Sequence, residues 1–443
     1  MGLKTKTFHQ ESDLVAHIKS HAPTFYFSSR TSTVIPFEKL EIELATEGDF
    51  YLCDLSKIPG HMELLPNNHL LVRGAVSWQE ADQFLRSKGR AIMTSPTEQL
   101  ALITGGVATS CTGERCFAFG NMRQQVVRLK YLDHNGTERE LSRSKKFQTF
   151  IPAWQKYCEE FRAFDFYKNA PYPRFEVETD LMIGTEGQLG VVTEVEIETA
   201  EDFSVNHVFM LLPRWEEDYA PHMEIYHAVQ KWRKDVISCE LLDANCMAYL
   251  KPDERLGNNQ DVIFLEIKAD SFEKVYGELL LHLKLITEDD IFEISAAKFH
   301  SVRAGVPRAV FEENSRMGVK KMGTDCQVAE NRFQELMDFY REAAKLGVRY
   351  NLFGHFGDAH LHYNYMPRPE DGPRCQEVFN KLYAKVLEWH GSPFAEHGIG
   401  LLKRPYIKAF HGPTQLEFFT EMKKIHDPYG QFFPQGFMGH QKA

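Results

Sequence analysis

Over residues 1–200, short stretches of alternating hydrophobic and polar positions are separated by turns and brief helical patterns. The stretch 70–78 alternates as a strand does, and 79–89 has apolar residues at helical spacing and ends at a glycine, a residue suited to a helix C-terminus. Residues 126–142 alternate on both sides of the pair Asn135–Gly136, which favours the tight turn of a β-hairpin. These patterns predict short strands with few long helices.

Beyond residue 200 the pattern changes to longer helical stretches that alternate with strands. Residues 221–234 and 271–284 have apolar positions at helical spacing, and the strand-like stretch 262–269 lies between them. A long helical pattern over 329–347 precedes a strand-rich stretch over 348–366. This order of elements predicts an α+β unit with an antiparallel sheet.

The composition is typical of a globular protein with a large core. The 443 residues are 43% hydrophobic and 26% charged, and the formal net charge of −11 argues against nucleic acid as a partner, because that requires a concentrated basic surface. No apolar run approaches the roughly 18 residues of a membrane-spanning helix, and the N-terminal segment lacks a secretory apolar core. The eight cysteines have no metal-ligand spacing, which indicates free thiols. We therefore expect a cytoplasmic protein, with peripheral membrane contact left open.

Three glycine-rich stretches are candidates for binding a phosphate-containing cofactor. They are ITGGVATSCTG at 103–113, FAFGNM at 117–122 and IGTEGQLGVV at 183–192. Glycine permits a ligand to approach the backbone closely, and backbone N–H groups can bind phosphate oxygens. None of the three has the G-x-G-x-x-G or P-loop spacing. For each stretch taken alone, an ordinary turn is the favoured interpretation.

A second cluster of reactive side chains is GHFGDAHLH, residues 354–362. On a strand, His360 and His362 lie on the same face, and a turn at Gly357–Asp358 can bring His355 back to that face. Imidazoles combined with a carboxylate are typical ligands of zinc and similar divalent ions. Farther along the chain, the adjacent pair Glu396–His397 offers further groups of this kind. The alternative is a polar loop without a ligand.

Taken in order, the glycine-rich stretches resemble the FAD-binding half of the vanillyl-alcohol oxidase/PCMH flavoprotein superfamily. GHFGDAHLH, FAEHGIGLLK and IHDPYGQFFPQGF are similar to motifs of its D-lactate/glycolate/D-2-hydroxyglutarate dehydrogenase branch. The resemblance covers nearly the whole chain and implies an α+β, two-domain PCMH-type fold. It implies an FAD-binding domain over 1–200, a substrate (cap) domain with an antiparallel sheet over 201–391, and a C-terminal segment, 392–443, that returns to the FAD domain with catalytic residues.

The resemblance also implies which residues bind FAD. We expect FAD to be noncovalent because His134 of the hairpin turn is poorly placed for a covalent link, and Cys111 and Cys116 in the glycine-rich region are left open as alternatives. The residues it assigns to FAD are Gly105, Gly106, Thr109, Gly113, Gly120, Gly187, Gly190 and Val192. The early glycine loop of the family is missing, since residues 28–37 contain no glycine. We expect Arg30, Thr31 and Ser32 to take its place with a guanidinium group and two hydroxyls.

For catalysis, the resemblance implies a divalent metal, expected to be zinc, bound by His355, His362 and Glu396. It makes His397 the general base, because an imidazole can accept a proton at neutral pH. It also implies that Arg303 binds a substrate carboxylate and that Lys321, or its neighbour Lys320, contacts the substrate. His360 stands where the family has asparagine, and it is a further ligand, a partner of a ligand or a solvent-facing residue.

The implied function is FAD-dependent oxidation of a D-2-hydroxy acid of the lactate, glycolate or 2-hydroxyglutarate type to the 2-oxo acid. The electron acceptor is not identified by the sequence, and a homodimer is left open. One alternative is a flavoprotein that acts on another alcohol or in ether-lipid chemistry. A second alternative is a flavin-poor relative that serves as a binding or scaffold protein, which the missing glycine loop motivates.

Overall fold

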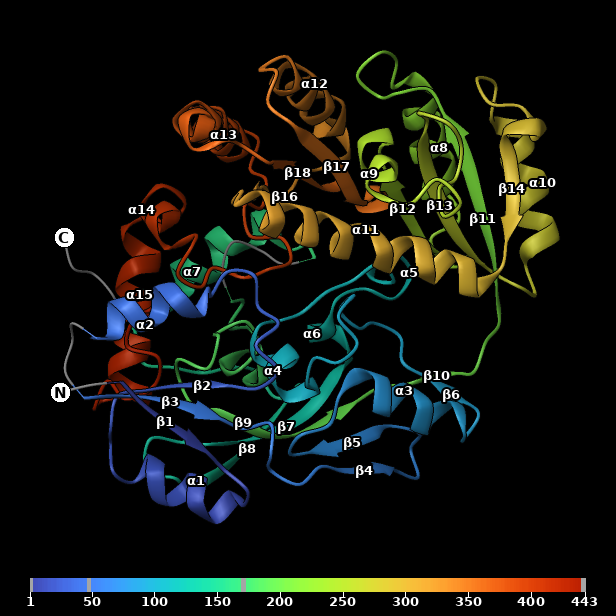
Figure 1. Cartoon of the computed structure of the whole chain (residues 1–443). Coiled ribbons are helices and arrows are strands. Elements are labelled where there is room, and N and C mark those ends of the chain that lie inside the picture. Colours follow the sequence, from blue (N-terminus) through green and yellow to red (C-terminus); the bar gives the residue numbers. More distant parts are fainter. Residues whose placement is uncertain (1–2, 46–48, 169–172, 440–443) are drawn as a thin grey trace. The chain divides into compact units, whose positions relative to one another are not determined.

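The computed structural model describes residues 3–45, 49–168 and 173–439, and these fall into two compact units (Figure 1). The first unit is assembled from three stretches of the chain, Met1–Gly113, Asn121–Asp202 and Glu396–Ala443. The second unit consists of Phe203–Ala395 together with the short segment Glu114–Gly120. The second unit is therefore nearly continuous in sequence, whereas the first is completed only by the last stretch of the chain.

The first unit contains two main sheets. In one sheet β3 lies between β1 and β2 and is parallel to both. The other sheet is antiparallel, with the strand order β4-β5-β9-β7-β8, and a short pair, β6 and β10, lies apart from it. The strands are β1 (Leu3–Thr7), β2 (Thr24–Phe27), β3 (Phe50–Asp54), β4 (His61–Leu64), β5 (Leu70–Arg73), β6 (Arg90–Ala91), β7 (Val126–Leu132), β8 (Glu138–Ser142), β9 (Val191–Ile197) and β10 (Ala200–Glu201).

The helices of the first unit are short, apart from the last one, which has 14 residues. They are α1 (Glu11–Ile18), α2 (Phe37–Ala45), α3 (Trp78–Arg86), α4 (Ile103–Ala108), α6 (Met122–Gln125), α7 (Trp154–Phe161), α14 (Ile407–Phe410) and α15 (Pro413–His426). The strand predicted over 70–78 ends at Arg73, because Gly74 turns the chain with a φ of +70° and Ser77 then caps α3. In this cap the Ser77 side chain accepts a hydrogen bond from the backbone N–H of Glu80. The Glu80 side chain in turn accepts a hydrogen bond from the backbone N–H of Ser77.

The hairpin predicted around Asn135–Gly136 is confirmed as β7 and β8. The backbone N–H of Gly136 donates to the carbonyl oxygen of Asp133 at 2.8 Å, and Gly136 has a φ of +68°, which glycine adopts without strain. The Asp133 side chain accepts hydrogen bonds from the backbone N–H groups of Asn135 and Thr137. The turn residues therefore fix the register of this hairpin.

The second unit is built on one large antiparallel sheet, as the sequence predicts. Its strand order is β14-β11-β13-β12-β17-β18-β15, and β16 also pairs with β18. The strands are β11 (Val205–Leu212), β12 (Val236–Leu242), β13 (Asp261–Lys268), β14 (Ile291–Ile294), β15 (Met322–Gly323), β16 (Cys326–Gln327), β17 (Tyr350–His355) and β18 (His360–Tyr365). The central strands are buried along most of their length.

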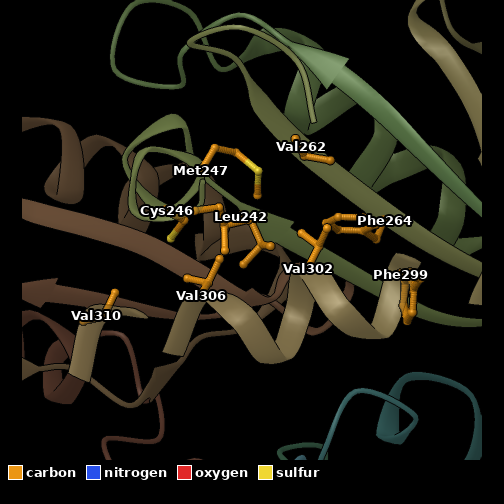
Figure 2. Packing of buried hydrophobic residues seen from close by; sticks show 10 residues of the cluster. Leu242, Cys246, Met247, Val262, Phe264, Phe299, Val302, Val306 and Val310 are labelled. Atoms are coloured by element: carbon orange, nitrogen blue, oxygen red, sulfur yellow. The ribbon is translucent and has the colours of Figure 1, made fainter. Parts of the chain in front are cut away.

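The helices of the second unit are α5 (Cys116–Phe119), α8 (Ala220–Gln230), α9 (Ala244–Tyr249), α10 (Phe272–His282), α11 (Ala296–Met317), α12 (Phe333–Ala344) and α13 (Gly372–Glu388). In α11, Phe299, Val302, Val306 and Val310 recur at helical spacing, and they pack against strand residues that include Leu242 and Phe264 (Figure 2). Burial of each such side chain contributes about 1.5–3 kcal/mol. None of the helices in the described residues is long and apolar enough to cross a lipid bilayer.

Candidate functional site

One face of the sheet in the second unit carries a row of polar side chains across its central strands. The strand register places Glu266 of β13 opposite both His207 of β11 and Ser238 of β12. The pairing of Leu241 with Gly354 puts the preceding residue, Glu240, across from His355 of β17. Because directly paired residues of a sheet share a face, these side chains form one continuous polar row.

The hairpin of β17 and β18 adds the three histidines to this row. His355 pairs directly with His360, and His362 lies two residues farther along β18, so all three share one face. The turn between them is a short 3-10 helix, Phe356–Asp358, followed by Ala359 with a φ of +52°. Each histidine offers a ring nitrogen within 4.8 Å of those of the other two. The predicted return of His355 to the face of His362 is therefore confirmed.

Gly354 makes room for this arrangement. A Cβ atom at this position would lie 3.2 Å from Cδ2 of His362 and 3.0 Å from the carbonyl oxygen of His360. The residue also has a φ of +136°, which side-chain-bearing residues rarely adopt. A larger residue at position 354 would therefore displace the His362 ring or strain the hairpin.

Each histidine of the cluster has one ring nitrogen held by a hydrogen-bond acceptor. Nδ1 of His355 donates to Oε1 of Glu240 at 2.8 Å, and Nε2 of His360 donates to Oδ1 of Asp325 at 3.0 Å. Nδ1 of His362 donates to the carbonyl oxygen of Thr324 at 3.1 Å. A carboxylate or carbonyl can only accept, so in a neutral ring the second nitrogen carries the lone pair. This is the arrangement found around histidines that bind a metal.

Glu396 and His397 follow directly after the last residue of the second unit. The backbone N–H of Ala395 donates to the carbonyl oxygen of Asp325 at 3.0 Å, and the peptide bond to Ala395 holds Glu396 at this end of the unit. Glu396 itself belongs to the first unit, and the three histidines belong to the second. The assignment of Glu396 as a metal ligand therefore stays a prediction.

The burial of His360 excludes one of the three roles that the sequence leaves open for it. Its side chain is 0% exposed, so the solvent-facing interpretation is wrong. It lies between His355 and His362, with ring centroids 5.4 and 4.8 Å away, and bonds to the equally buried Asp325. His360 is therefore either a further ligand or a partner of the ligands.

Arg303, the predicted partner of a substrate carboxylate, is already paired with two carboxylates of the protein. Nη1 lies 3.0 Å from Oε1 of Glu114, and Nη2 donates to Oε2 of Glu240 at 3.1 Å. Burial would lower the pKa of Arg303, but Glu114 and Glu240 outweigh it and raise that pKa above its usual value. Burial would likewise raise the pKa of Glu114, and Arg303 holds it below the usual value. The ion pair of Arg303 and Glu114 is thus fully charged.

A second ion pair continues the polar row. Arg115 donates to Glu266 at 3.0 Å, and the Ser238 hydroxyl donates to the other oxygen of Glu266 at 2.9 Å. Three carboxylates, from Glu114, Glu240 and Glu266, therefore meet only two guanidinium groups, from Arg303 and Arg115. The Asp325 carboxylate, which bonds to His360, adds a fourth acidic group, so carboxylates outnumber guanidinium groups beside the histidines. A divalent cation at the histidines would offset this excess of carboxylates, so the donor set and its surroundings fit a metal.

The two predicted substrate lysines lie at the end of α11. Lys320 and Lys321 are both exposed and lie between Gly318 and β15. Lys321 differs from its neighbour in that protein atoms around its ammonium group displace water and lower its pKa. The assignment of Lys321 as a substrate contact stays a prediction.

In the first unit, hydrogen bonds bring together three of the segments assigned to FAD. The Ser29 hydroxyl accepts from the backbone N–H of Leu102 at 3.3 Å, next to the start of α4. The backbone N–H of Glu186 donates to the carbonyl oxygen of Ala108 at 2.9 Å, at the end of α4. The loop before Arg30, the glycines of α4 and the turn at 184–190 are therefore neighbours. Gly120 belongs to the second unit instead.

Most of the assigned glycines are in close contact with other protein atoms. A Cβ atom would lie 2.6 Å from the Ser28 hydroxyl at Gly105, 2.9 Å from the Cys111 sulfur at Gly106, and 2.1 Å from the Ser95 carbonyl oxygen at Gly113. At Gly190 it would meet the Tyr131 ring at 2.6 Å. By contrast, Gly187 is open, with the nearest such atom at 3.9 Å, and has a φ of +70°. Among these five positions, only Gly187 therefore leaves space beside the backbone.

The remaining assigned residues lie around this region. The Arg30 guanidinium stacks on the rings of Phe27 and Phe37 at 4.4 and 4.6 Å, while Thr31 is exposed and Ser32 half-buried. The Thr109 hydroxyl donates to the carbonyl oxygen of Gly105, at the end of α4. None of these contacts tests the binding of FAD, so the assignments stay predictions.

Two features of the first unit fit a cofactor that carries hydrogen-bond acceptors. The indole N–H of Trp78, packed beneath Gly106, and the hydroxyl of Thr112 are buried and have no hydrogen-bond partner in the described part of the chain. Buried donors of this kind usually have an acceptor. Val192 also borders a largely apolar pocket together with Leu55, Ile58, Leu102 and Thr104. These residues are compatible with the FAD that the sequence predicts.

Sequence reasoning missed the residues that hold the histidines, namely Glu240, Asp325 and Thr324. A signal for Glu240 is present, because it is the one charged residue of the strand VISCELL. Glu266 is likewise the one charged residue between the two ends of the strand DVIFLEIK. A charged residue inside an apolar strand has to find a partner in the protein interior.

Comparison with known proteins identifies both halves of the chain. Residues 39–142 match the family described as an FAD binding domain, and residues 218–435 match the C-terminal domain of FAD linked oxidases. A solved alkyldihydroxyacetonephosphate synthase has a similar fold, with a TM-score of 0.66 at 11% identity, and the match covers 97% of this chain and 75% of that one. At this identity the likeness concerns the fold alone.

Several curated relatives are similar in sequence. The mitochondrial D-lactate dehydrogenase [cytochrome] of Kluyveromyces lactis is 22% identical over 398 residues, which is 86% of this chain and 64% of that protein. The mitochondrial D-2-hydroxyglutarate dehydrogenase of Danio rerio is 26% identical over 268 residues, 57% of this chain and 49% of its own length. A D-lactate dehydrogenase of Anaerostipes hadrus is 23% identical over 395 residues, 85% of this chain and 77% of that one. The chain thus spans less than two thirds of the first two relatives.

Proposed function

We propose that this chain, which belongs to the FAD-linked oxidases and has their two-domain PCMH-type fold, oxidises a D-2-hydroxy acid to the 2-oxo acid. The relatives named as D-lactate and D-2-hydroxyglutarate dehydrogenases support this substrate class. The observation that carries the proposal is the single face on which His355, His360 and His362 lie, each with one ring nitrogen already bonded. Such a cluster suits the activation of a hydroxyl group.

In this proposal the residues of the chain have distinct roles. FAD, when bound in the first unit, supplies the acceptor for the hydride of the substrate. A divalent metal, when bound by His355, His362 and Glu396, lowers the pKa of a hydroxyl group. His397, next to Glu396 in the chain, accepts the hydroxyl proton, since an imidazole titrates near neutral pH.

The carboxylate of the substrate has to share Arg303 with two glutamates. The guanidinium has five N–H donors, and its ion pairs with Glu114 and Glu240 involve only its two terminal nitrogens. A bound metal would offset the surplus negative charge of this region and so favour an anionic substrate. Lys321 would contribute a second positive charge.

The test is anaerobic reduction of the bound flavin, followed by its visible absorption. The FAD-loaded protein is mixed with the D- and L-forms of lactate and 2-hydroxyglutarate, and with glycolate. We expect bleaching by a D-2-hydroxy acid and not by its L-form. Full FAD content without reduction by any of these acids contradicts the proposal. Reoxidation by air or by an artificial dye then separates an oxidase from a dehydrogenase.

The pairing of Arg303 favours one alternative, a flavoprotein that acts on an alcohol without a carboxylate. If Glu114 and Glu240 hold the guanidinium permanently, a neutral alcohol would meet no charge conflict there. Reduction by neutral alcohols but not by hydroxy acids would favour this alternative. Purified protein without flavin absorption, even after incubation with FAD, would instead favour a binding or scaffold role.

A further inference from the structure

The buried ion pairs of the second unit end on a member of the histidine cluster. Arg303 of α11 binds Glu114 through one terminal nitrogen and Glu240 through the other, at 3.0 and 3.1 Å. The second oxygen of Glu240 accepts the hydrogen bond from Nδ1 of His355 at 2.8 Å. The side chains of Glu240 and His355 are each 5% exposed, so water does not compete for these bonds. Both oxygens of Glu240 are therefore engaged, one by Arg303 and one by His355.

This geometry constrains His355 in two ways. Glu240 lies across from His355 in the sheet, so the backbone register sets the distance between the two side chains. A carboxylate that accepts from Nδ1–H fixes the tautomer in which Nε2 carries the lone pair, and it increases the basicity of that nitrogen. The ion pair with Arg303 in turn prevents the carboxylate from rotating away. A rigid ring with one defined donor atom is what a metal ligand requires.

We propose that Glu240 is the positioning residue of the metal site, and that Arg303 and the strand register hold it in place. The inference rests on the proposed function, because it assumes that His355 binds a divalent metal. It goes beyond that function in giving Glu240 a role in metal affinity without direct contact to the metal.

Glu114 provides a matched control within the same network. It binds the same guanidinium group at nearly the same distance, whereas the hydrogen bond from Nδ1 of His355 goes to Glu240. Glu240→Asp and Glu114→Asp both keep every charge and both shorten the side chain by one methylene group. Glu240→Asp withdraws the carboxylate that accepts the hydrogen bond from Nδ1 of His355, whereas Glu114→Asp acts on the shared guanidinium group. The two variants thus separate the positioning of the ligand from the electrostatics of the region.

The experiment measures the affinity of the full-length, FAD-loaded protein for Zn²⁺ by competition with a chelating dye. Co²⁺ is then used as a second probe, because its visible spectrum reports the geometry of its ligands. We expect Glu240→Asp to lower Zn²⁺ affinity by about 10- to 100-fold and to alter the Co²⁺ spectrum, as loss of such an outer partner does elsewhere. We expect Glu114→Asp to leave both close to those of the wild type.

The outcomes distinguish the inference from the function on which it rests. Equal affinities in the wild type and Glu240→Asp, or equal losses in the two variants, overturn the positioning role while leaving the metal site intact. A wild-type protein that binds neither Zn²⁺ nor Co²⁺ overturns the metal site and this inference together. If Glu240→Asp does not fold, Glu240→Gln and Glu114→Gln replace the pair. They remove the same charge, so a larger loss in Glu240→Gln supports the proposal and equal losses overturn it.

Discussion

The carboxylate of Glu186 accepts a hydrogen bond from the backbone N–H of Ile399 at 2.6 Å, although the two residues are 213 positions apart. The same carboxylate accepts from the backbone N–H of Gly400. Gly398 fits beside it only because it lacks a side chain, since a Cβ atom would lie 2.6 Å from Oε1 of Glu186. One buried glutamate thus anchors the loop that directly follows Glu396 and His397.

The first prediction concerns the pH dependence of stability that Glu186 causes. Burial raises the pKa of Glu186 from 4.5 to about 7, despite the two backbone N–H donors. The folded protein therefore holds this proton more tightly than the unfolded chain, and its free energy of unfolding falls as the pH rises from 4.5 to 7. The loss from this one group is on the order of 3 kcal/mol.

Glu186→Gln is the variant that tests this dependence. Glutamine keeps an oxygen that can accept from both N–H groups but carries no charge. We expect thermal unfolding midpoints of the wild type to fall relative to those of the variant between pH 4.5 and 7, with no further change above pH 7. Midpoints that differ by a constant amount across this range would show that Glu186 does not titrate there.

The second prediction concerns the metal ligands His355 and His362. His355→Ala and His362→Ala should each lose bound metal and flavin reduction by substrate, because each removes one donor from the cluster. FAD content should stay normal, since the residues assigned to FAD lie mainly in the first unit. Elemental analysis and flavin absorbance measure the two contents. The exposed His227, replaced by alanine, serves as the control that should change neither.

The third prediction is that His360→Ala is not silent. The substitution leaves the buried Asp325 carboxylate without its bond to His360 and opens space in the cluster. We expect a loss of about 1–3 kcal/mol in the free energy of unfolding, together with a lower metal affinity. Denaturant unfolding and metal competition measure these effects. Wild-type values in both measurements would argue against a role of His360 at the site.

The fourth prediction concerns His397, whose loss as a base should differ in effect from the loss of a metal ligand. His397→Ala should keep metal and FAD but slow flavin reduction by about 10²- to 10⁴-fold, the usual contribution of a positioned acid or base. Rapid mixing under anaerobic conditions measures the rate. A rate of flavin reduction that recovers as the pH is raised would support His397 as the base, because solvent hydroxide then accepts the proton in its place. An unchanged rate would exclude His397 from this role.

The fifth prediction is that Arg303→Lys is more harmful than its conserved charge suggests. An ammonium group cannot reach Glu114 and Glu240 with the flat geometry of the guanidinium, so one of the two buried carboxylates loses its partner. We expect a loss of about 3–5 kcal/mol in stability and a lower kcat/KM for the acid, with FAD content unchanged. If Arg303→Lys is as stable and as active as the wild type, neither ion pair depends on the planar guanidinium group of Arg303.

The histidine hairpin was predictable because its geometry depends on local spacing. The two-residue interval between His360 and His362 sets their common face, and a turn at Gly357–Asp358 is enough to return His355 to it. The antiparallel sheet and the hairpin at Asn135–Gly136 follow from similarly local patterns. The patterns that predict these elements each lie within about ten residues of sequence.

The partners of the histidines could not be predicted in this way. The bond from His355 to Glu240 spans 115 positions, and no local pattern specifies which buried acid meets which ring. The burial of His360 likewise depends on its bond to Asp325 and on β16, which pairs with β18. Both come from a separate part of the chain. The joining of residues 114–120 to the second unit also leaves no trace in periodicity. Such relationships are created by tertiary packing.

The assembly of the first unit from three stretches of the chain has a consequence for folding during synthesis. Thr24 of β2 exchanges backbone hydrogen bonds with Gln431 and Phe433, which the ribosome adds long after β2. The second unit consists mainly of one continuous stretch, so it can finish folding while β2 still has an open edge. A nascent chain stalled before residue 431 would therefore expose an unpaired strand, the kind of edge through which polypeptides associate wrongly. Successful biosynthesis then depends on protecting that edge until synthesis is complete.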